Sequence, residues 1–212
     1  MQDVADRLGV AKGTVYGYVA GKAALLAAAV RYADGVEPPP EPAALPVRTP
    51  VAGEVAALVA DRLRGEVAEL RLVKAVAGRR RVPIADELTE IIADLYRRLA
   101  RHRVSIKLVD RCAPELPDLG EVWFGAGRAG QVAVLTDYLT RRAASRALRL
   151  PGPAAVVART ILETCVLWAV HLHWDPAGGD PGDREQPPPD VVAATLAGLL
   201  THGLVSEEGI SR

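Results

Sequence analysis

The sequence is short of cysteine, of aromatic residues and of any excess charge. Two cysteines in 212 residues, Cys112 and Cys165, exclude a disulfide-rich secreted scaffold. Aromatic residues make up 4%, and the alanine, valine and leucine that dominate instead favour helices over sheets. Lys and Arg together number 26, as do Asp and Glu, so any contact with nucleic acid must come from a local basic patch.

Long apolar runs are also missing. None approaches the roughly 18 residues that a membrane-spanning helix needs, and the start of the chain lacks the pattern of a signal peptide. Half of the residues are nevertheless hydrophobic and 25% are charged, which allows a packed core and excludes disorder throughout. The composition therefore predicts a soluble, cytoplasmic, mostly helical protein with no membrane segment.

Two proline-rich segments interrupt the helical patterns. Residues 34–50 hold six prolines, which remove hydrogen-bond donors and clash inside helices. Residues 175–189 hold three glycines and five prolines, and they are predicted to form a polar loop. These breaks predict an N-terminal domain at residues 1–34, a proline-rich linker at 35–50 and a larger helical domain at 51–212.

The larger domain repeats apolar residues at helical spacing. The pattern predicts helices that begin near residue 51 and then span 83–114, 119–148, 154–174 and 191–204. Helix 154–174 is apolar on nearly every side and must be buried. In a chain of this size we expect it to pack, with helix 191–204, against a second copy in a homodimer.

The N-terminal segment has the pattern of two short helices joined by a tight turn. Val4, Ala5 and Leu8 share one face of the first helix, and the glycine of the Gly9-Val10 pair is the residue that such a turn tolerates. In the second helix Val15 and Val19 share a face, which leaves hydrogen-bonding side chains to point outward. This arrangement is typical of a helix-turn-helix, whose second helix enters the major groove of DNA.

At these residues the chain resembles the TetR family of bacterial transcriptional regulators. The matching positions are Ala5, Gly9-Val10, Lys12-Gly13-Thr14, Tyr16, Tyr18, and Lys22 followed by Leu25-Leu26. The resemblance implies an all-α fold, with a helix-turn-helix head followed by a larger helical domain that binds a small effector and dimerises. It also implies a homodimer on a double-stranded operator with two half-sites, in which the effector changes the spacing of the two heads.

The resemblance also assigns DNA contacts to single residues. Lys12, Gly13 and Thr14 would open the recognition helix and face bases or nearby phosphates, and Gly13, with no side chain, would allow a close approach to the groove. Tyr16 and Tyr18 would give hydroxyl groups to phosphates, which position the head rather than specify the sequence.

Further positions complete or depart from this pattern. Lys22 would pair with a phosphate at a helix N-terminus, and Gly17 replaces what is often a larger residue, so sequence readout would be thin. Ala11 stands where Ser or Thr usually caps the recognition helix. Met1 falls inside the first turn of the second helix of the family, which predicts that it is an internal methionine of a longer native protein. The alternative function is therefore a helical dimeric ligand-binding or interaction module whose truncated head binds DNA weakly or not at all.

Effector-binding residues are sought among the aromatic and polar side chains of the larger domain. Ligand pockets are apolar with a few polar groups. The candidates are Tyr96, His102, Trp123, Phe124, Arg128, Tyr138 and Trp168. For each aromatic residue, a place in the ordinary core is the alternative.

Other patterns carry no function. Residues 125–130 match the dinucleotide-binding spacing G-x-G-x-x-G but lack the strand and the acidic residue it requires, so these glycines predict a close-packed or kinked helix. His171 and His173 point to different helix faces and Asp175 begins a loop, so no metal site is expected. The arginines of residues 79–81 are interpreted as a solvated face. With no Ser-His-Asp set, nucleophile elbow or P-loop, neither an enzyme nor a cofactor is predicted.

Overall fold

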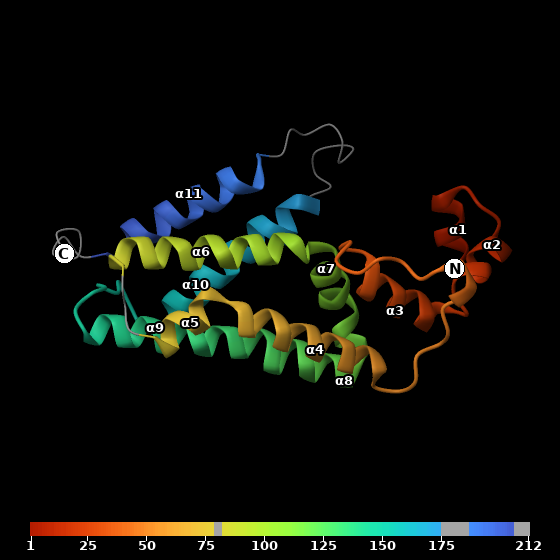
Figure 1. Ribbon diagram of the computed structural model, residues 1–212, viewed down its shortest axis with the longest axis horizontal. Coiled ribbons are helices and arrows are strands. Elements are labelled where there is room, and N and C mark those ends of the chain that lie inside the picture. The colour runs from red at the N-terminus through yellow and green to blue at the C-terminus, as the bar shows by residue number, and fades with distance from the viewer. Residues whose placement is uncertain (79–81, 175–186, 206–212) are drawn as a thin grey trace. The chain divides into compact units, whose positions relative to one another are not determined.

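The computed structural model describes residues 1–78, 82–174 and 187–205 (Figure 1). Over this part of the chain all regular structure is helical, apart from two isolated β-bridges, which confirms the all-α prediction. The α-helices are α1 (Gln2–Leu8), α2 (Lys12–Tyr18), α3 (Lys22–Tyr32), α4 (Glu54–Glu69), α5 (Arg71–Ala77), α6 (Ile84–Arg101), α7 (Arg103–Cys112), α8 (Pro117–Gly120), α9 (Gly130–Ala144), α10 (Ala154–Val166) and α11 (Pro189–His202).

The packing of the chain divides it into two compact units. The first comprises Met1–Asp61 with Val104–Trp123, and the second comprises Arg62–Arg103 with Phe124–Arg212. The first unit therefore contains α1, α2 and α3, the linker, the first half of α4 and most of α7. The second contains α5, α6, α9, α10 and α11.

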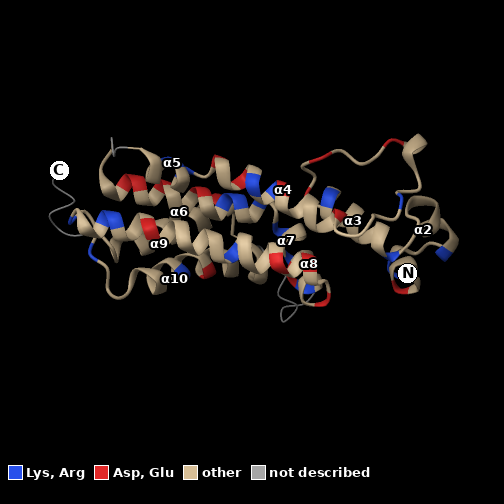
Figure 2. Ribbon diagram, turned by 90° about the horizontal axis from the view of Figure 1, so that it is seen from below, with Lys and Arg blue, Asp and Glu red and all other residues tan. Residues whose placement is uncertain are grey.

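Helix α6 forms the centre of the second unit. It begins directly after Pro83 and buries one face at helical spacing, formed by Ile84, Leu88, Ile91, Ile92, Leu95, Tyr96 and Leu99. This face packs against α11 and α10, and α10 packs in turn against α9. In Figure 2 the acidic residues of α6 lie toward its N-terminal half and the basic residues toward its C-terminal half, which complements the helix dipole.

The predicted helix 83–114 is in fact two helices. His102 leaves the helical conformation (φ −104°, ψ 20°), and α7 begins at the next residue. The first N–H groups of α7 find a partner far away in sequence, because a carboxylate oxygen of Asp34 lies 2.9 Å from the N–H of Val104 and another lies 3.2 Å from that of Ser105. The prediction of a single helix was therefore wrong. The break was missed because the apolar residues keep their helical spacing across it.

The predicted helix 119–148 is also divided. After α8 the chain follows a π-helix over Glu121–Ala129 and returns to the α-conformation in α9. The irregularity expected at residues 125–130 is confirmed. Of the three glycines, Gly127 is buried, which is compatible with the expected close packing, whereas a Cβ atom at Gly125 or Gly130 would meet nothing within 4 Å.

The apolar helix at 154–174 is α10 followed by a π-helical segment, Leu167–His171, and a short 3-10 turn, Leu172–Trp174. The stretch Ala154–His171 is long and apolar enough to cross a membrane by length and composition alone, and 44% of it is buried. Arg159 and Glu163 interrupt its apolar residues. A single such helix is weak evidence for a membrane span, because core helices can have the same length and composition.

Ile92→Ala should destabilise the second unit. Ile92 has no exposed surface in α6, so the shortened side chain loses its contacts and leaves a cavity. We expect the free energy of unfolding to fall by about 2 to 5 kcal/mol, measured by urea denaturation followed by circular dichroism. Val36→Ala, at a residue that is 51% exposed, is the control and should change stability little. Equal stabilities of the two variants would contradict the central place of α6.

Candidate nucleic-acid interface

The turn between α1 and α2 depends on Gly9. Gly9 adopts the left-handed conformation (φ 66°, ψ 29°), which a residue without a Cβ enters at little cost. Its N–H bonds to carbonyl oxygens of the last turn of α1, and the N–H of Val10 donates to the Ala5 carbonyl at 3.0 Å. The turn therefore ends α1 and leads the chain directly into α2.

A small apolar core holds α1, α2 and α3 together. Ala5 and Ala24 have no exposed surface, and Val15 and Val19 are each 5% exposed. The two alanines allow the helices to approach closely around the two valines. The inward direction predicted for Val15 and Val19 is confirmed, whereas Leu8, expected on the inner face of α1, is 65% exposed. The short α1 turns Leu8 away from this core.

The six candidate residues on α2 are all exposed: Lys12, Gly13, Thr14, Tyr16, Gly17 and Tyr18. At 3.6 residues per turn they surround the helix on the sides that Val15 does not occupy, with Gly13 and Gly17 opposite Val15. Tyr16 is 43% and Tyr18 is 58% exposed. This surface offers one ammonium group and several hydroxyl groups, which are donors that suit phosphates and base edges.

The local charge also suits an anionic partner. From residue 7 to residue 33 the chain holds four basic residues, Arg7, Lys12, Lys22 and Arg31, and no acidic residue. Lys22 is exposed at the first position of α3, directly after Gly21. The free N–H groups of a helix N-terminus add positive potential at that position. This stretch thus has an excess of positive charge in a chain whose net charge is zero, with Asp3 and Asp6 directly before it and Arg31 paired with Glu37 at 3.7 Å.

The start of α2 has no side-chain cap. Ala11 takes the extended N-cap conformation (φ −67°, ψ 145°) and its carbonyl accepts the N–H of Thr14 at 2.9 Å, but it has no side-chain oxygen to offer. The sequence prediction of an uncapped recognition helix is confirmed. The first N–H groups of α2 therefore lack the side-chain acceptor that a Ser or Thr would supply.

The proline-rich linker returns to α2. Val47 forms a parallel β-bridge with Val19: its N–H donates to the Tyr18 carbonyl at 2.8 Å, and its carbonyl accepts the N–H of Ala20 at 2.9 Å. Its side chain packs against the core of α1, α2 and α3. We call residues 45–50 the strap. An isolated valine among prolines is too weak a pattern to have predicted this contact.

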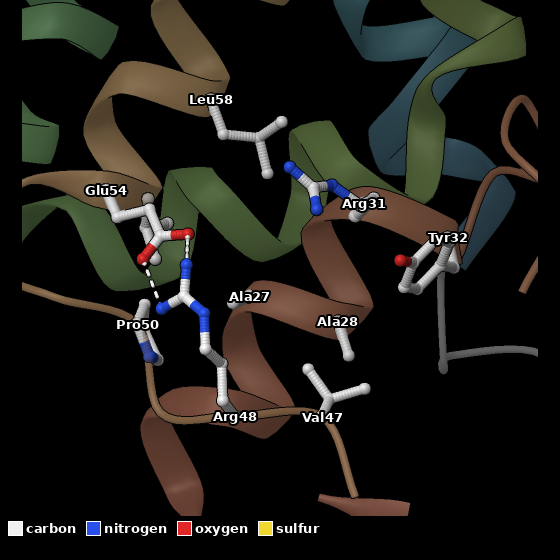
Figure 3. Close-up of a pocket in the computed structure, with 10 residues that line it drawn as sticks. Ala27, Ala28, Arg31, Tyr32, Val47, Arg48, Pro50, Glu54 and Leu58 are labelled. Atoms are coloured by element: carbon white, nitrogen blue, oxygen red, sulfur yellow. Dashed lines mark hydrogen bonds and ion pairs between the residues drawn. The ribbon is translucent and has the colours of Figure 1, made fainter. Parts of the chain in front are cut away.

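Beyond the strap, the linker joins α4 through an ion pair. Arg48 donates from both of its terminal nitrogens to the carboxylate of Glu54, at 2.8 and 2.6 Å, as Figure 3 shows. Glu54 also accepts the N–H of Val51 at 2.9 Å. These hydrogen bonds hold the pKa of Glu54 below its usual value, the bond from Arg48 contributing most.

The effector-pocket candidates differ in burial and in their partners, and their role stays a prediction. Tyr96 and Tyr138 are core residues, 3% and 1% exposed. The Tyr138 hydroxyl donates to Glu87 at 2.9 Å, and burial raises the pKa of this hydroxyl. Phe124 and Trp168 are exposed by 41% and 39%.

The remaining candidates have polar partners. In the first unit, the indole N–H of Trp123 donates to Asp110 at 2.9 Å. In the second unit, Nε2 of His102 lies 3.1 Å from Glu66, and Arg128 lies 3.4 Å from Glu163. Each of these polar groups is thus engaged within the protein.

Within the described residues, each unit contains a cavity. The first, of about 90 Å³, lies between α3, the strap and the start of α4 (Figure 3). The second, of about 490 Å³, is an open groove between α5 and α6 lined largely by charged residues such as Arg71 and Glu90. None of the seven effector candidates lines either cavity.

No metal-binding cluster of three or more His, Cys, Asp or Glu residues is found in the described ranges. His173 contacts Arg103 at 2.6 Å, and burial together with this cation lowers the pKa of the histidine. Asp175, the loop predicted at 175–189 up to residue 186, and the arginines at 79–81 lie outside the described residues.

Comparison with known proteins gives two matches. Residues 1–29 match the family model of bacterial regulatory proteins, tetR family. The fold is similar to the crystal structure of a bacterial regulatory protein in the tetR family from Rhodococcus RHA1, with a TM-score of 0.53 and 16% sequence identity over 86% of this chain and 97% of that chain. At this identity the likeness concerns the fold alone. No curated protein matches the sequence.

Ala11→Ser should stabilise α2. The new hydroxyl can accept an N–H of the first turn of the helix, which has no side-chain acceptor now. We expect a gain of about 1 kcal/mol in local stability, measured as slower amide hydrogen exchange at Val15 and Tyr16. Ala20→Ser, at an exposed alanine between helices, is the matched control. If both variants exchange at the same rate, the missing cap does not limit the stability of α2.

Proposed function

Since the chain is a DNA-binding regulator of the TetR family by its N-terminal head, we propose that it acts as a ligand-responsive repressor and binds a two-half-site operator as a homodimer. The observation that carries this proposal is the exposed face of α2, directed outward by the buried Val15 and Val19. Its ammonium and hydroxyl groups are the donors that a major groove and its phosphates accept.

The seven candidate DNA-binding residues have different roles in this proposal. Lys12 and Thr14 face base edges or nearby phosphates at the start of α2. Tyr16 and Tyr18 donate their hydroxyls to phosphates on the two sides of the groove, and Lys22 binds a phosphate at the start of α3. Gly13 and Gly17 carry no side chain, and a Cβ atom at either would meet nothing within 4 Å in the protein.

Dimerisation is proposed through α10, its π-helical continuation and α11. Each carries large apolar side chains on a face that the chain itself leaves exposed: Val156 (60%), Leu167 (44%), Trp168 (39%), Val191 (54%) and Leu199 (69%). Two helices with one face in the core and another apolar face in water favour a second copy as the partner. Symmetric pairing would give each dimer two recognition helices.

The proposed regulation follows from this geometry. A dimer places its two α2 helices in successive major grooves, whose spacing is set by the DNA helix. A small molecule that binds the second unit more tightly in a different conformation shifts the heads away from that spacing and releases the operator. The effector is part of the proposal, and the residues proposed to contact it remain Tyr96, His102, Trp123, Phe124, Arg128, Tyr138 and Trp168. The protein would act in the cytoplasm, where its operator lies.

The alternative is a helical dimer that binds a ligand or a partner but not DNA. The uncapped start of α2 and the exposure of Leu8 favour it, since both weaken a small head. A fluorescence-anisotropy titration with a labelled random-sequence duplex at two salt concentrations separates the two proposals. Saturable binding that weakens with salt supports the regulator, and no binding at low salt supports the alternative.

Lys22→Ala should weaken DNA binding on every sequence. Removing one phosphate contact lowers the dependence of log affinity on log salt concentration by about one unit. Anisotropy titrations of one duplex over a range of salt concentrations measure this slope. Lys74→Ala removes the same charge from the second unit and is the matched control. An unchanged slope in Lys22→Ala would show that Lys22 does not bind a phosphate.

Leu199→Glu and Val156→Glu should each convert the dimer to a monomer. The free-energy cost of burying an unpaired carboxylate in an apolar interface exceeds the free energy that the original leucine or valine contributes to dimerisation. Sedimentation velocity measures the mass, and circular dichroism checks that each variant remains helical. Val36→Glu, on the exposed linker, is the control. A dimer that persists in both interface variants would place the interface elsewhere.

A further inference from the structure

We propose that Arg48 is a positioning residue for the recognition helix: by binding Glu54 at the start of α4, it holds the strap, and the strap holds the C-terminal end of α2. The inference rests on the proposed DNA-binding function and adds a second support for α2 besides α1 and α3. All of the residues in the argument lie within the first unit, in Met1–Asp61.

The first step is the contact between the strap and α2. Tyr18 is the last residue of α2, where carbonyl groups no longer have a partner within the helix. Val47 supplies the N–H for the Tyr18 carbonyl and accepts the N–H of Ala20, at 2.8 and 2.9 Å. The strap therefore hydrogen-bonds to the backbone on both sides of Val19. Its position restrains the backbone of Tyr18, and with it the direction in which the Tyr18 side chain points.

The second step is the hold on the strap itself. The residue after Val47 is Arg48, whose two-pronged hydrogen bond to Glu54 is the arrangement that restrains a guanidinium group most. The same carboxylate accepts the N–H of Val51. Residues 47–54 are thus closed into one hydrogen-bonded loop, with Val47 at its α2 end and the first turn of α4 at the other.

The third step is the packing beneath the strap. The side chain of Val47 packs against the core of α1, α2 and α3, whereas Arg48 borders a cavity of about 90 Å³ that Ala27, Ala28 and Glu54 also line (Figure 3). The contacts that join the strap to α4 are therefore the Arg48–Glu54 ion pair and the hydrogen bond from the Val51 N–H to Glu54.

The ion pair can be tested from both of its sides. Arg48→Gln and Glu54→Gln each remove one charge and the two-pronged bond, and the double variant Arg48→Gln/Glu54→Gln shows how far the two losses are coupled. Glu41→Gln, at an exposed carboxylate of the same linker, is the matched control for loss of a negative charge.

The experiment measures two quantities on the full chain. The first is the amide hydrogen exchange of Ala20 and Val47, by nuclear magnetic resonance without DNA. The second is the affinity, with its salt dependence, for the tightest duplex that the unaltered protein selects from a random pool. We expect both single variants to exchange Ala20 and Val47 faster and to bind this duplex about two- to fivefold more weakly with an unchanged salt slope. The double variant should lose less than the sum of the two single losses, because both act through one contact, and Glu41→Gln should alter neither quantity.

The opposing outcomes are distinct. Unchanged exchange at Ala20 and Val47 in both single variants overturns the inference, whatever the affinity. Faster exchange with unchanged affinity overturns it as well and leaves the proposed function standing. A reduced salt slope in Arg48→Gln but not in Glu54→Gln makes Arg48 a phosphate contact instead. If the unaltered protein selects no duplex, the proposed function fails and the inference fails with it.

Discussion

The burial of Val15 and Val19 against Ala5 and Ala24 is the interaction on which the head depends. A core this small can hold the three helices together only because the two alanines let α1 and α3 approach α2 closely. It orients α2 about its own axis: once two valines face inward, the residues between them must face outward. The exposure of Tyr16 and Tyr18, and with it the candidate interface, follows from that rotation.

Two long-range contacts then connect this head to the rest of the first unit. Asp34 supplies its carboxylate to the first N–H groups of α7, and the Ser105 hydroxyl donates to the Val30 carbonyl at 3.1 Å. On the other side, Val47 pairs with the end of α2. Asp34 and Val47 both lie in the segment that follows α3. The proline-rich linker therefore forms structural contacts near each of its ends.

The local features were predictable because their causes are local. The left-handed turn at Gly9, the inward valines and the missing cap at Ala11 depend on neighbouring residues and on helical spacing. The division at His102 was not predicted, since an apolar pattern continues through it, whereas the glycines at 125–130 had indicated the irregularity that the π-helix over Glu121–Ala129 forms. What ends α6 and starts α7 involves a carboxylate 70 positions away, and no window of sequence contains both.

By itself, the sequence determined the helical class, the helix-turn-helix of residues 1–29 and the side chains that α2 presents outward, because composition, periodicity and turn chemistry act over a few residues. Only the tertiary structure decided the return of Val47 to α2 and the capping of α7 by Asp34. The physical reason is that these contacts join backbone groups and charges that are distant in the chain, and their partners become neighbours only after the helices have packed.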